Sequence, residues 1–194
     1  MESPLPPHWH SRGFLPHFHA PGQIQALTFR LGDSVPSSVI ARWRSELASS
    51  GDDTELRKRI SRYEDAGHGD CLLRHAPNAA LVESSLFHAD GLRYRLLDWC
   101  IMPNHVHALI EPLEGCSLGE IIRTWKTFSA REINKLEKRT GPLWSREYHD
   151  RYIRDQEHYD SARAYIRMNP VKAGLCRAAE DWRWSSAYYG NLRP

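Results

Sequence analysis

Two histidines stand one residue apart in the apolar stretch MPNHVHALIEP, residues 102–112. Successive side chains of a β-strand point to opposite faces, so we expect His105 and His107 on one face and Val106 on the other. Two neutral imidazoles at this spacing can share one divalent metal ion. The pattern also fits two half-exposed polar positions on an edge strand, and the pair alone does not decide between these interpretations.

A tyrosine and an asparagine lie four residues apart in ARAYIRMNPVKAG, residues 162–174. If this stretch is a helix, Tyr165 and Asn169 share one face. A tyrosine hydroxyl can act as a nucleophile, and an amide oxygen is a hard metal ligand. A set of His, His and Asn would leave coordination positions open for substrate oxygens. The alternative is a core tyrosine followed by an asparagine that ends the helix before Pro170.

The histidines are predicted to lie on the second strand of a β-hairpin. Residues 94–102 and 105–111 are rich in aromatic and branched side chains, and a Pro-Asn turn separates them. An earlier strand is predicted at residues 24–31, and residues 141–155 fit an aromatic, charged strand or loop. With helices between these strands, the pattern predicts an α+β fold, a central antiparallel sheet packed with helices.

Helices are predicted on both sides of the hairpin in the sequence. One spans residues 39–48 with a cap at Ser37 or Ser38, and the next covers 51–67 and closes at Gly67. A long amphipathic helix covers 117–139. The helix with Tyr165 begins at 156 and ends before Pro170, because the residue before a proline is disfavoured in the α region. Residues 76–91 show helical spacing of Ala80, Leu81, Ser84, Leu86 and Phe87.

Length and composition fit one domain with appendages: 194 residues, 41% hydrophobic, with a formal net charge of +2. So mild a charge does not by itself indicate nucleic-acid binding. The four cysteines form no C-x-x-C pair, which argues against zinc-finger and thioredoxin-like sites. We find no signal-peptide segment and no run near the ~20 apolar residues of a membrane span. We therefore expect a cytoplasmic protein without a membrane partner.

Four stretches together resemble the REP-associated tyrosine transposases. This branch belongs to the single-tyrosine HUH transposases, with IS200-like transposases, and H-U-H stands for His, hydrophobic residue, His. The stretches are WCIMPNHVHALIEP, GPLWSREYHDRYIRD, YIRMNPVKAG and DWRWSSA, and WHSRGFLPHF and LTFRLGDSVP are similar to the family's opening. The resemblance covers nearly the whole chain, and the order and spacing of its motifs are specific. Residues 52–88 are less diagnostic.

The resemblance implies a role for each candidate residue. Tyr165 would be the catalytic nucleophile, and His105 and His107 the metal-binding pair. Asn169 would complete the coordination of Mg²⁺ or Mn²⁺; insertion-sequence relatives have glutamine there, and asparagine agrees with the REP-associated branch. The implied reaction is cleavage and rejoining of single-stranded DNA at hairpin sequences through a 5′-phosphotyrosine intermediate. The sequence does not identify the general base.

The resemblance also implies a domain organisation. We place an N-terminal arm at residues 1–22 and an IS200-like catalytic domain at 23–175, with a ferredoxin- or RRM-like sheet and a variable helical insertion at about 50–90. An irregular C-terminal tail follows at 176–194. The histidines are expected on a central strand and the tyrosine on a nearby helix.

Basic residues close to the candidate site in the sequence are candidates for phosphate contacts, which would make DNA affinity depend on salt. For each one, a solvated charge paired with a carboxylate is an equally good interpretation. Trp184 could stack on unpaired bases, whereas Trp144 and Trp182 fit the core better. The basic candidates are Arg151, Arg154, Arg163, Arg167 and Lys172. The family resemblance adds Arg12, in the arm that would help to read a short sequence beside the hairpin.

Other functions remain compatible with these residues. A domesticated protein would bind DNA hairpins without cleaving them, and a metal-dependent hydrolase would use Tyr165 only to position its substrate. A replication-initiator or relaxase nickase shares the histidine pair but commonly carries further regions, for which 194 residues leave little room. The expected partner is single-stranded DNA with a hairpin, bound by a monomer or a homodimer.

Overall fold

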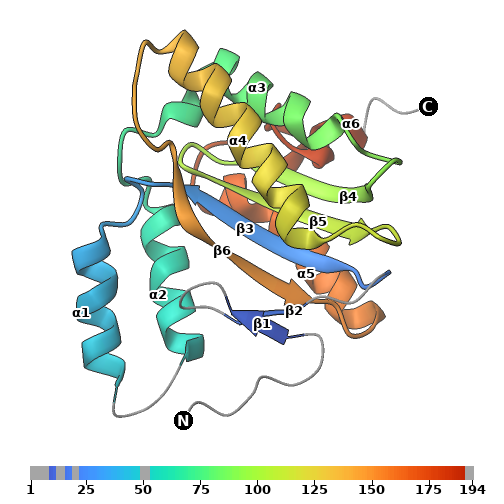
Figure 1. Cartoon of the computed structure of the whole chain (residues 1–194), viewed down its shortest axis with the longest axis horizontal. Helices are drawn as coiled ribbons and strands as arrows, with labels where there is room; N and C mark the ends of the chain where they lie inside the picture. The colour runs from blue at the N-terminus through green and yellow to red at the C-terminus, as the bar shows by residue number, and fades with distance from the viewer. Residues whose placement is uncertain (1–8, 12–15, 19–21, 49–52, 191–194) are drawn as a thin grey trace.

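A four-stranded antiparallel sheet lies between two groups of helices (Figure 1). This computed structural model describes residues 9–11, 16–18, 22–48 and 53–190. The strands are β3 (Gln25–Leu31), β4 (Tyr94–Ile101), β5 (His105–Pro112) and β6 (Trp144–Tyr152), in the order β4-β5-β3-β6. The predicted α+β class and β-hairpin are confirmed, and the strand of the two histidines lies inside the sheet.

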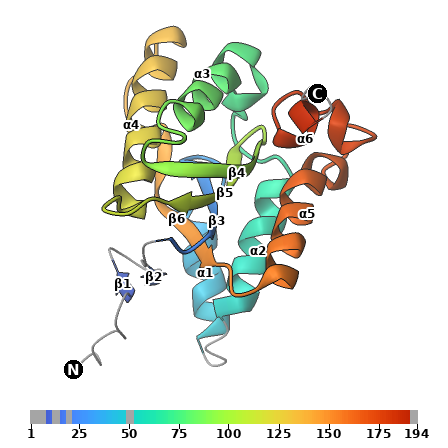
Figure 2. The same ribbon diagram turned by 90° about the vertical axis from the view of Figure 1, so that its right-hand side faces the viewer.

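One face of the sheet carries the main hydrophobic core. Helices α3 (Ala76–Phe87) and α4 (Leu118–Leu136) cover this face (Figure 2). Phe29 of β3 and Val106 of β5 point into it, because alternate residues of a strand share a face. Trp125 of α4 is 2% exposed and packs edge-on against Tyr94. The indole N–H of Trp125 donates a hydrogen bond to the Tyr94 hydroxyl.

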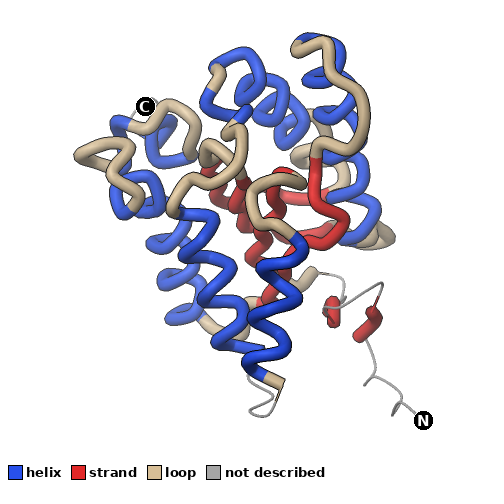
Figure 3. Tube along the Cα trace, turned by 90° about the vertical axis from the view of Figure 1, so that its left-hand side faces the viewer, coloured by secondary structure: helices blue, strands red, loops and turns tan. Residues whose placement is uncertain are grey.

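The opposite face is covered by α2 (Asp53–Asp65) and α5 (Gln156–Lys172), with α1 (Ser37–Leu47) packed on α2 (Figure 3). Its apolar cluster is smaller and leaves part of the face to polar side chains. The cluster consists of Cys100, Met102, Leu109, Ile153 and Ile166. The two helices on this face are far apart in the chain, since α2 precedes β4 and α5 follows β6.

The first and last described segments lie against the two edges of the sheet. β1 (Trp9–Ser11) pairs antiparallel with β2 (Pro16–Phe18), and β2 lies near β6. The tail was expected to be irregular, and this is wrong for its middle. After η2 (Ala179–Asp181), a short α6 (Ser186–Gly190) packs beside β4, and the Ile101 N–H donates to the Trp184 carbonyl. The tail therefore covers the outer edge of β4.

Three local predictions about helices are wrong. Helix α5 runs through Pro170 to Lys172, because a proline near a helix end removes only its own N–H donor and the helix stops within two residues. Pro36, not Ser37 or Ser38, is the N-terminal cap of α1, and it makes no side-chain capping bond. The buried face of α3 is shifted to include two hydrogen-bonded polar side chains; it consists of Asn78, Ala79, Val82, Ser85 and Leu86.

Within the described residues, no helix combines the length and the apolar character that crossing a membrane requires.

Candidate metal centre and nucleophile

The two histidines lie side by side under the α2/α5 layer. His105 is 1% exposed and His107 is 3% exposed, and their Nε2 atoms are 2.9 Å apart. Their strand pairs with β4 on one side and β3 on the other. The interpretation as half-exposed positions on an edge strand is therefore wrong, and the expected shared face is confirmed.

Asn104 fixes the proton arrangement of His105. The Asn104 amide nitrogen donates to the carbonyls of Glu64, at 3.0 Å, and His68, at 2.9 Å. Its oxygen must then face His105 Nδ1, which is 2.7 Å away. Since that oxygen can only accept, Nδ1 of His105 carries a hydrogen and Nε2 of the neutral ring carries a lone pair. This is the state in which an imidazole binds a metal.

Both rings are held neutral by their surroundings. Burial lowers the pKa of His105 well below its usual value, and the neighbouring His107 adds to the effect. Burial, assisted by His149, lowers the pKa of His107 to about 3. His107 Nδ1 is 2.9 Å from the Thr28 hydroxyl, which can donate or accept.

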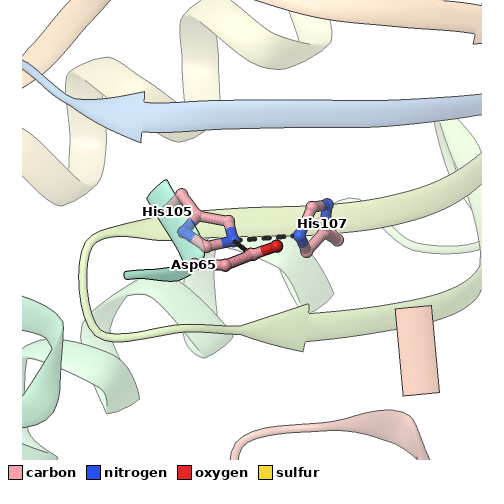
Figure 4. A group of neighbouring side chains, drawn as sticks. All are labelled: Asp65, His105 and His107. Atoms are coloured by element: carbon pink, nitrogen blue, oxygen red, sulfur yellow. Dashed lines mark hydrogen bonds and ion pairs between the residues drawn. The ribbon is translucent and has the colours of Figure 1, made fainter. Parts of the chain in front are cut away.

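A carboxylate from α2 joins the histidine pair (Figure 4). Asp65 Oδ1 lies 3.7 Å from His105 Nε2, and the three possible ligand atoms of Asp65, His105 and His107 lie within 4.8 Å of one another. Sequence reasoning missed Asp65, because it lies in the less diagnostic middle of the chain, 40 positions before His105. No spacing motif marks it, and only the packing of α2 against the hairpin brings it to the site.

The donor set suits a divalent metal ion. Two imidazole nitrogens and a carboxylate oxygen lie within 4.8 Å of one another, and Asp65 Oδ1 is buried without a hydrogen-bond partner among the described residues. A buried carboxylate oxygen that faces the lone pair of His105 Nε2 and has no donor is unfavourable unless a cation lies between them. Divalent metals that accept mixed nitrogen and oxygen ligands fit this arrangement.

Tyr165 lies directly beside the histidine pair. Its ring is 5.5 Å from the ring of His107, at an interplanar angle of 80°. The Tyr165 hydroxyl is 3.1 Å from the hydroxyl of Ser61 in α2, and the ammonium of Lys172 lies 5.0 Å from the ring centre. Burial raises the pKa of Tyr165, and the hydrogen bond with Ser61 partly counters this. The side chain is still 38% exposed, so a substrate can reach it.

Asn169 lies one turn beyond Tyr165 on α5, as the spacing predicted. It is 2% exposed, and its amide nitrogen donates to the Tyr165 carbonyl at 2.9 Å. This bond fixes the amide against its own helix. The role of Asn169 as a metal ligand remains a prediction.

The candidate DNA-binding residues fall into separate groups. Arg163 and Arg167 each donate from Nε to a carboxylate oxygen of Asp98 at 2.8 Å, and Asp98 is fully buried. These two arginines hold α5 on β4, a role that sequence reasoning missed, and their phosphate contacts remain a prediction. Arg151 and Arg154 are exposed near the end of β6, and Arg12 lies outside the described residues.

Trp144 and Trp182 pack in the core as expected, and the stacking of Trp184 on bases remains a prediction. Trp144 is 7% exposed in the main core, and Trp182 packs against the smaller cluster. Trp184 is partly buried and lies under the Arg183 guanidinium, 4.6 Å from its ring centre.

Known proteins share sequence and fold with this chain. The family model described as "Transposase IS200 like" matches residues 78–169. A Haemophilus influenzae protein assigned by name to the REP-associated tyrosine transposases is 30% identical over 97 residues, which cover 45% of this chain and 55% of that protein. An uncharacterised protein of the same organism is 29% identical over 102 residues, covering 40% and 54%. The chain thus spans about half the length of the curated relatives it matches.

A solved structure supports the fold. The structure of a REP-associated tyrosine transposase bound to a REP hairpin has a TM-score of 0.60 and 15% sequence identity, covering 93% of this chain and 86% of that chain. At this identity the likeness concerns the fold alone. The matched residues include the histidine strand and the tyrosine helix, whereas α2 precedes them in the chain. The resemblance expected from the sequence motifs is confirmed for residues 78–169, which the model of IS200-like transposases matches.

Proposed function

We propose that this protein cleaves and rejoins single-stranded DNA at hairpin sequences, with Tyr165 as the nucleophile. The observation that carries the proposal is the contact between a partly exposed tyrosine and a buried pair of neutral histidines, with ring centres 5.5 Å apart. A tyrosine used only for packing would gain nothing from two metal-binding groups beside it. A nucleophile that attacks phosphate needs such a neighbour.

The reaction is a transesterification. The Tyr165 oxygen forms a bond to a backbone phosphorus while the bond from that phosphorus to a 3′-oxygen breaks. The tyrosine proton leaves, the 3′-oxygen departs as a hydroxyl, and a 5′-phosphotyrosine link remains. A 3′-hydroxyl can reverse these steps and rejoin a strand. Because burial raises the pKa of Tyr165, its hydroxyl is protonated at neutral pH and must lose the proton during attack.

Residues of this chain would hold a divalent ion, Mg²⁺ or Mn²⁺, beside the nucleophile. His105 and His107 would bind it through Nε2, and the family resemblance adds Asn169. When bound, such an ion polarises a phosphate oxygen and stabilises the charge that develops on it. Ser61 orients the tyrosine hydroxyl, and Lys172 places a positive charge next to the ring.

The DNA strand would approach along the exposed side of Tyr165. Arg151, Arg154 and Lys172 are our candidates for neutralising its phosphates, and each neutralised phosphate steepens the salt dependence of affinity. Arg163 and Arg167 also lie on α5, two residues to either side of Tyr165, with side chains 44% and 31% exposed. They can combine their bond to Asp98 with a phosphate contact.

The test is a covalent-adduct assay. Labelled single-stranded hairpins with randomised flanks are incubated with protein and Mn²⁺ or Mg²⁺, then separated on a denaturing gel. We expect a protein–DNA band in the wild type and none in Tyr165→Phe. Tyr159→Phe is the matched control, since Tyr159 lies on the same helix but packs against the smaller apolar cluster.

Each other outcome identifies a rival function. Hairpin binding without any adduct in the wild type would indicate a DNA-binding protein that does not cleave. Cleavage without a covalent band, retained in Tyr165→Phe, would indicate a hydrolase in which water attacks. An adduct that persists in Tyr165→Phe would move the nucleophile to another residue.

A further inference from the structure

One face of α2 completes a site whose other parts come from the family-matched region. Ser61 and Asp65 are one helical turn apart on this face. Ser61 contacts the Tyr165 hydroxyl, and Asp65 contacts the histidine pair. The match to the family begins at residue 78, so α2 is contributed from outside it.

The Asp65 carboxylate is placed as a ligand and not as an ion-pair partner. Its Oδ1 is buried, faces His105 Nε2 at 3.7 Å and has no hydrogen-bond partner among the described residues. The hydrogen bonds of Asn104 leave His105 Nε2 as a lone pair. A single proton shared between the two Nε2 atoms, 2.9 Å apart, would still leave Asp65 Oδ1 without a donor. A cation satisfies all three atoms at once.

Charge gives a second reason. Two neutral imidazoles and the amide of Asn169 would form a ligand set without any negative charge. Hard ions such as Mg²⁺ and Mn²⁺ bind through oxygen ligands, and carboxylates are their usual protein donors. Asp65 is the acidic side chain that groups with the two histidines within the described residues.

We propose that Asp65 is a direct ligand of the catalytic metal ion, so that the site is a two-histidine, one-carboxylate centre assembled between α2 and β5. The inference rests on the proposed function for the presence of the metal. It adds that the helical segment before the family-matched region takes part in metal binding. Asn169 then acts mainly on α5 itself, through its bond to the Tyr165 carbonyl.

The first test measures how tightly the full-length protein binds Mn²⁺. Isothermal calorimetry gives the affinity, and the electron paramagnetic resonance signal of free Mn²⁺ gives an independent value. We expect Asp65→Asn, which keeps the side-chain shape and removes the charge, to weaken Mn²⁺ binding at least about tenfold. Asn169→Ala should weaken it less than Asp65→Asn does. Glu55→Gln is the matched control, because it removes one negative charge from the same helix away from the site. Unchanged binding in Asp65→Asn would overturn the proposal.

A second variant tests direct contact by a gain of signal. Asp65→Cys and Asn169→Cys are each loaded with Co²⁺ and compared with wild-type protein, whose own cysteines supply the baseline. A thiolate bound to Co²⁺ gives a charge-transfer absorption, which we expect for Asp65→Cys. Absorption in Asn169→Cys alone would assign the position to α5 and overturn the inference.

The two proposals fail in different ways. Wild-type protein that binds no Mn²⁺ would overturn the metal site as a whole, including Asp65. Intact Mn²⁺ binding that depends on Asp65, without a tyrosine adduct, would leave the ligand assignment standing and remove the transposition chemistry.

Discussion

The α3/α4 face and the α2/α5 face of the sheet are lined by the same strands but bury different chemistry. On β5, Val106 and Ala108 enter a continuous apolar core, whereas His105 and His107 enter a polar site beside a small cluster. The first face stabilises the fold through buried apolar area. The second face buries neutral imidazoles and a carboxylate oxygen that has no hydrogen-bond partner in the described part of the chain. Burying these groups is unfavourable, and the apolar area of the first face offsets that cost.

Removing a side chain from the apolar face should have the largest effect on stability. Trp125→Ala deletes a fully packed indole and its hydrogen bond to Tyr94, so we expect the free energy of unfolding to fall by about 3–5 kcal/mol. Chemical denaturation followed by circular dichroism measures this change. Phe128→Ala on the same helix is the control and should cost about 0.5 kcal/mol, since Phe128 is 36% exposed. A similar loss of unfolding free energy in both variants would show that burial in this core does not decide the contribution of a side chain.

Releasing α5 from β4 should have an intermediate effect on stability and a larger one on activity. Asp98→Ala removes the acceptor of Arg163 and Arg167 and of the Ser186 hydroxyl. Because both arginines are partly exposed and can turn to water, we expect a loss of about 1–3 kcal/mol. The rate of tyrosine-adduct formation should fall further, since Tyr165 lies between the two arginines.

The control for this prediction is Glu83→Ala. Glu83 accepts from Arg183 and Tyr189 and so holds the tail against α3, away from Tyr165. Equal losses of adduct formation in Asp98→Ala and Glu83→Ala would mean that general loosening, and not the position of α5, limits the reaction.

The smallest effect is a change in how stability depends on pH. In an unfolded chain a histidine titrates near pH 6.5, whereas burial lowers the pKa of His107 to about 3 in the metal-free fold. Between these values the unfolded state binds more protons. The contribution of His107 is therefore complete above pH 6.5 and is lost as the pH falls from 6.5 towards 3.

His107→Gln should flatten this dependence by up to one proton, or ~1.4 kcal/mol per pH unit. Urea unfolding of both proteins without metal, at about pH 7, 6 and 5, measures the difference. Glu64 acts in the opposite sense, because burial raises its pKa to about 7 and its contribution is lost as the pH rises. Because Glu64 is present in both the wild type and His107→Gln, its contribution cancels in the difference between their stabilities. Parallel pH profiles would show that His107 is not held neutral by the fold.

The sequence was most informative where chemistry and local periodicity coincide. His105 and His107 were placed on one strand face and Tyr165 and Asn169 on one helix face, because side-chain direction follows directly from the repeat of each element. Asp65 could not be found this way. Its place depends on how α2 packs against a hairpin far away in the chain, and no local pattern encodes that contact.

The local errors have a similar origin. Proline was expected to stop α5, but so close to the end of the helix the loss of one donor is a small penalty that packing overrides. The buried face of α3 was misassigned because Asn78 and Ser85 are buried with hydrogen bonds, which an apolar pattern does not count. The arginines beside Tyr165 were expected either to contact phosphates or to pair with carboxylates close in the sequence, and no local pattern links them to Asp98.

Asn104 links the protonation of His105 to the order of a neighbouring segment. Its amide holds the carbonyls of Glu64 and His68 at the end of α2 while its oxygen holds the proton of His105. A metal that binds the unprotonated Nε2 of His105 therefore also favours the state in which Asn104 holds these two carbonyls. Binding and local ordering become a single equilibrium, so loading the site should slow hydrogen–deuterium exchange at the amides of Ala66 and Gly67, which touch no ligand atom.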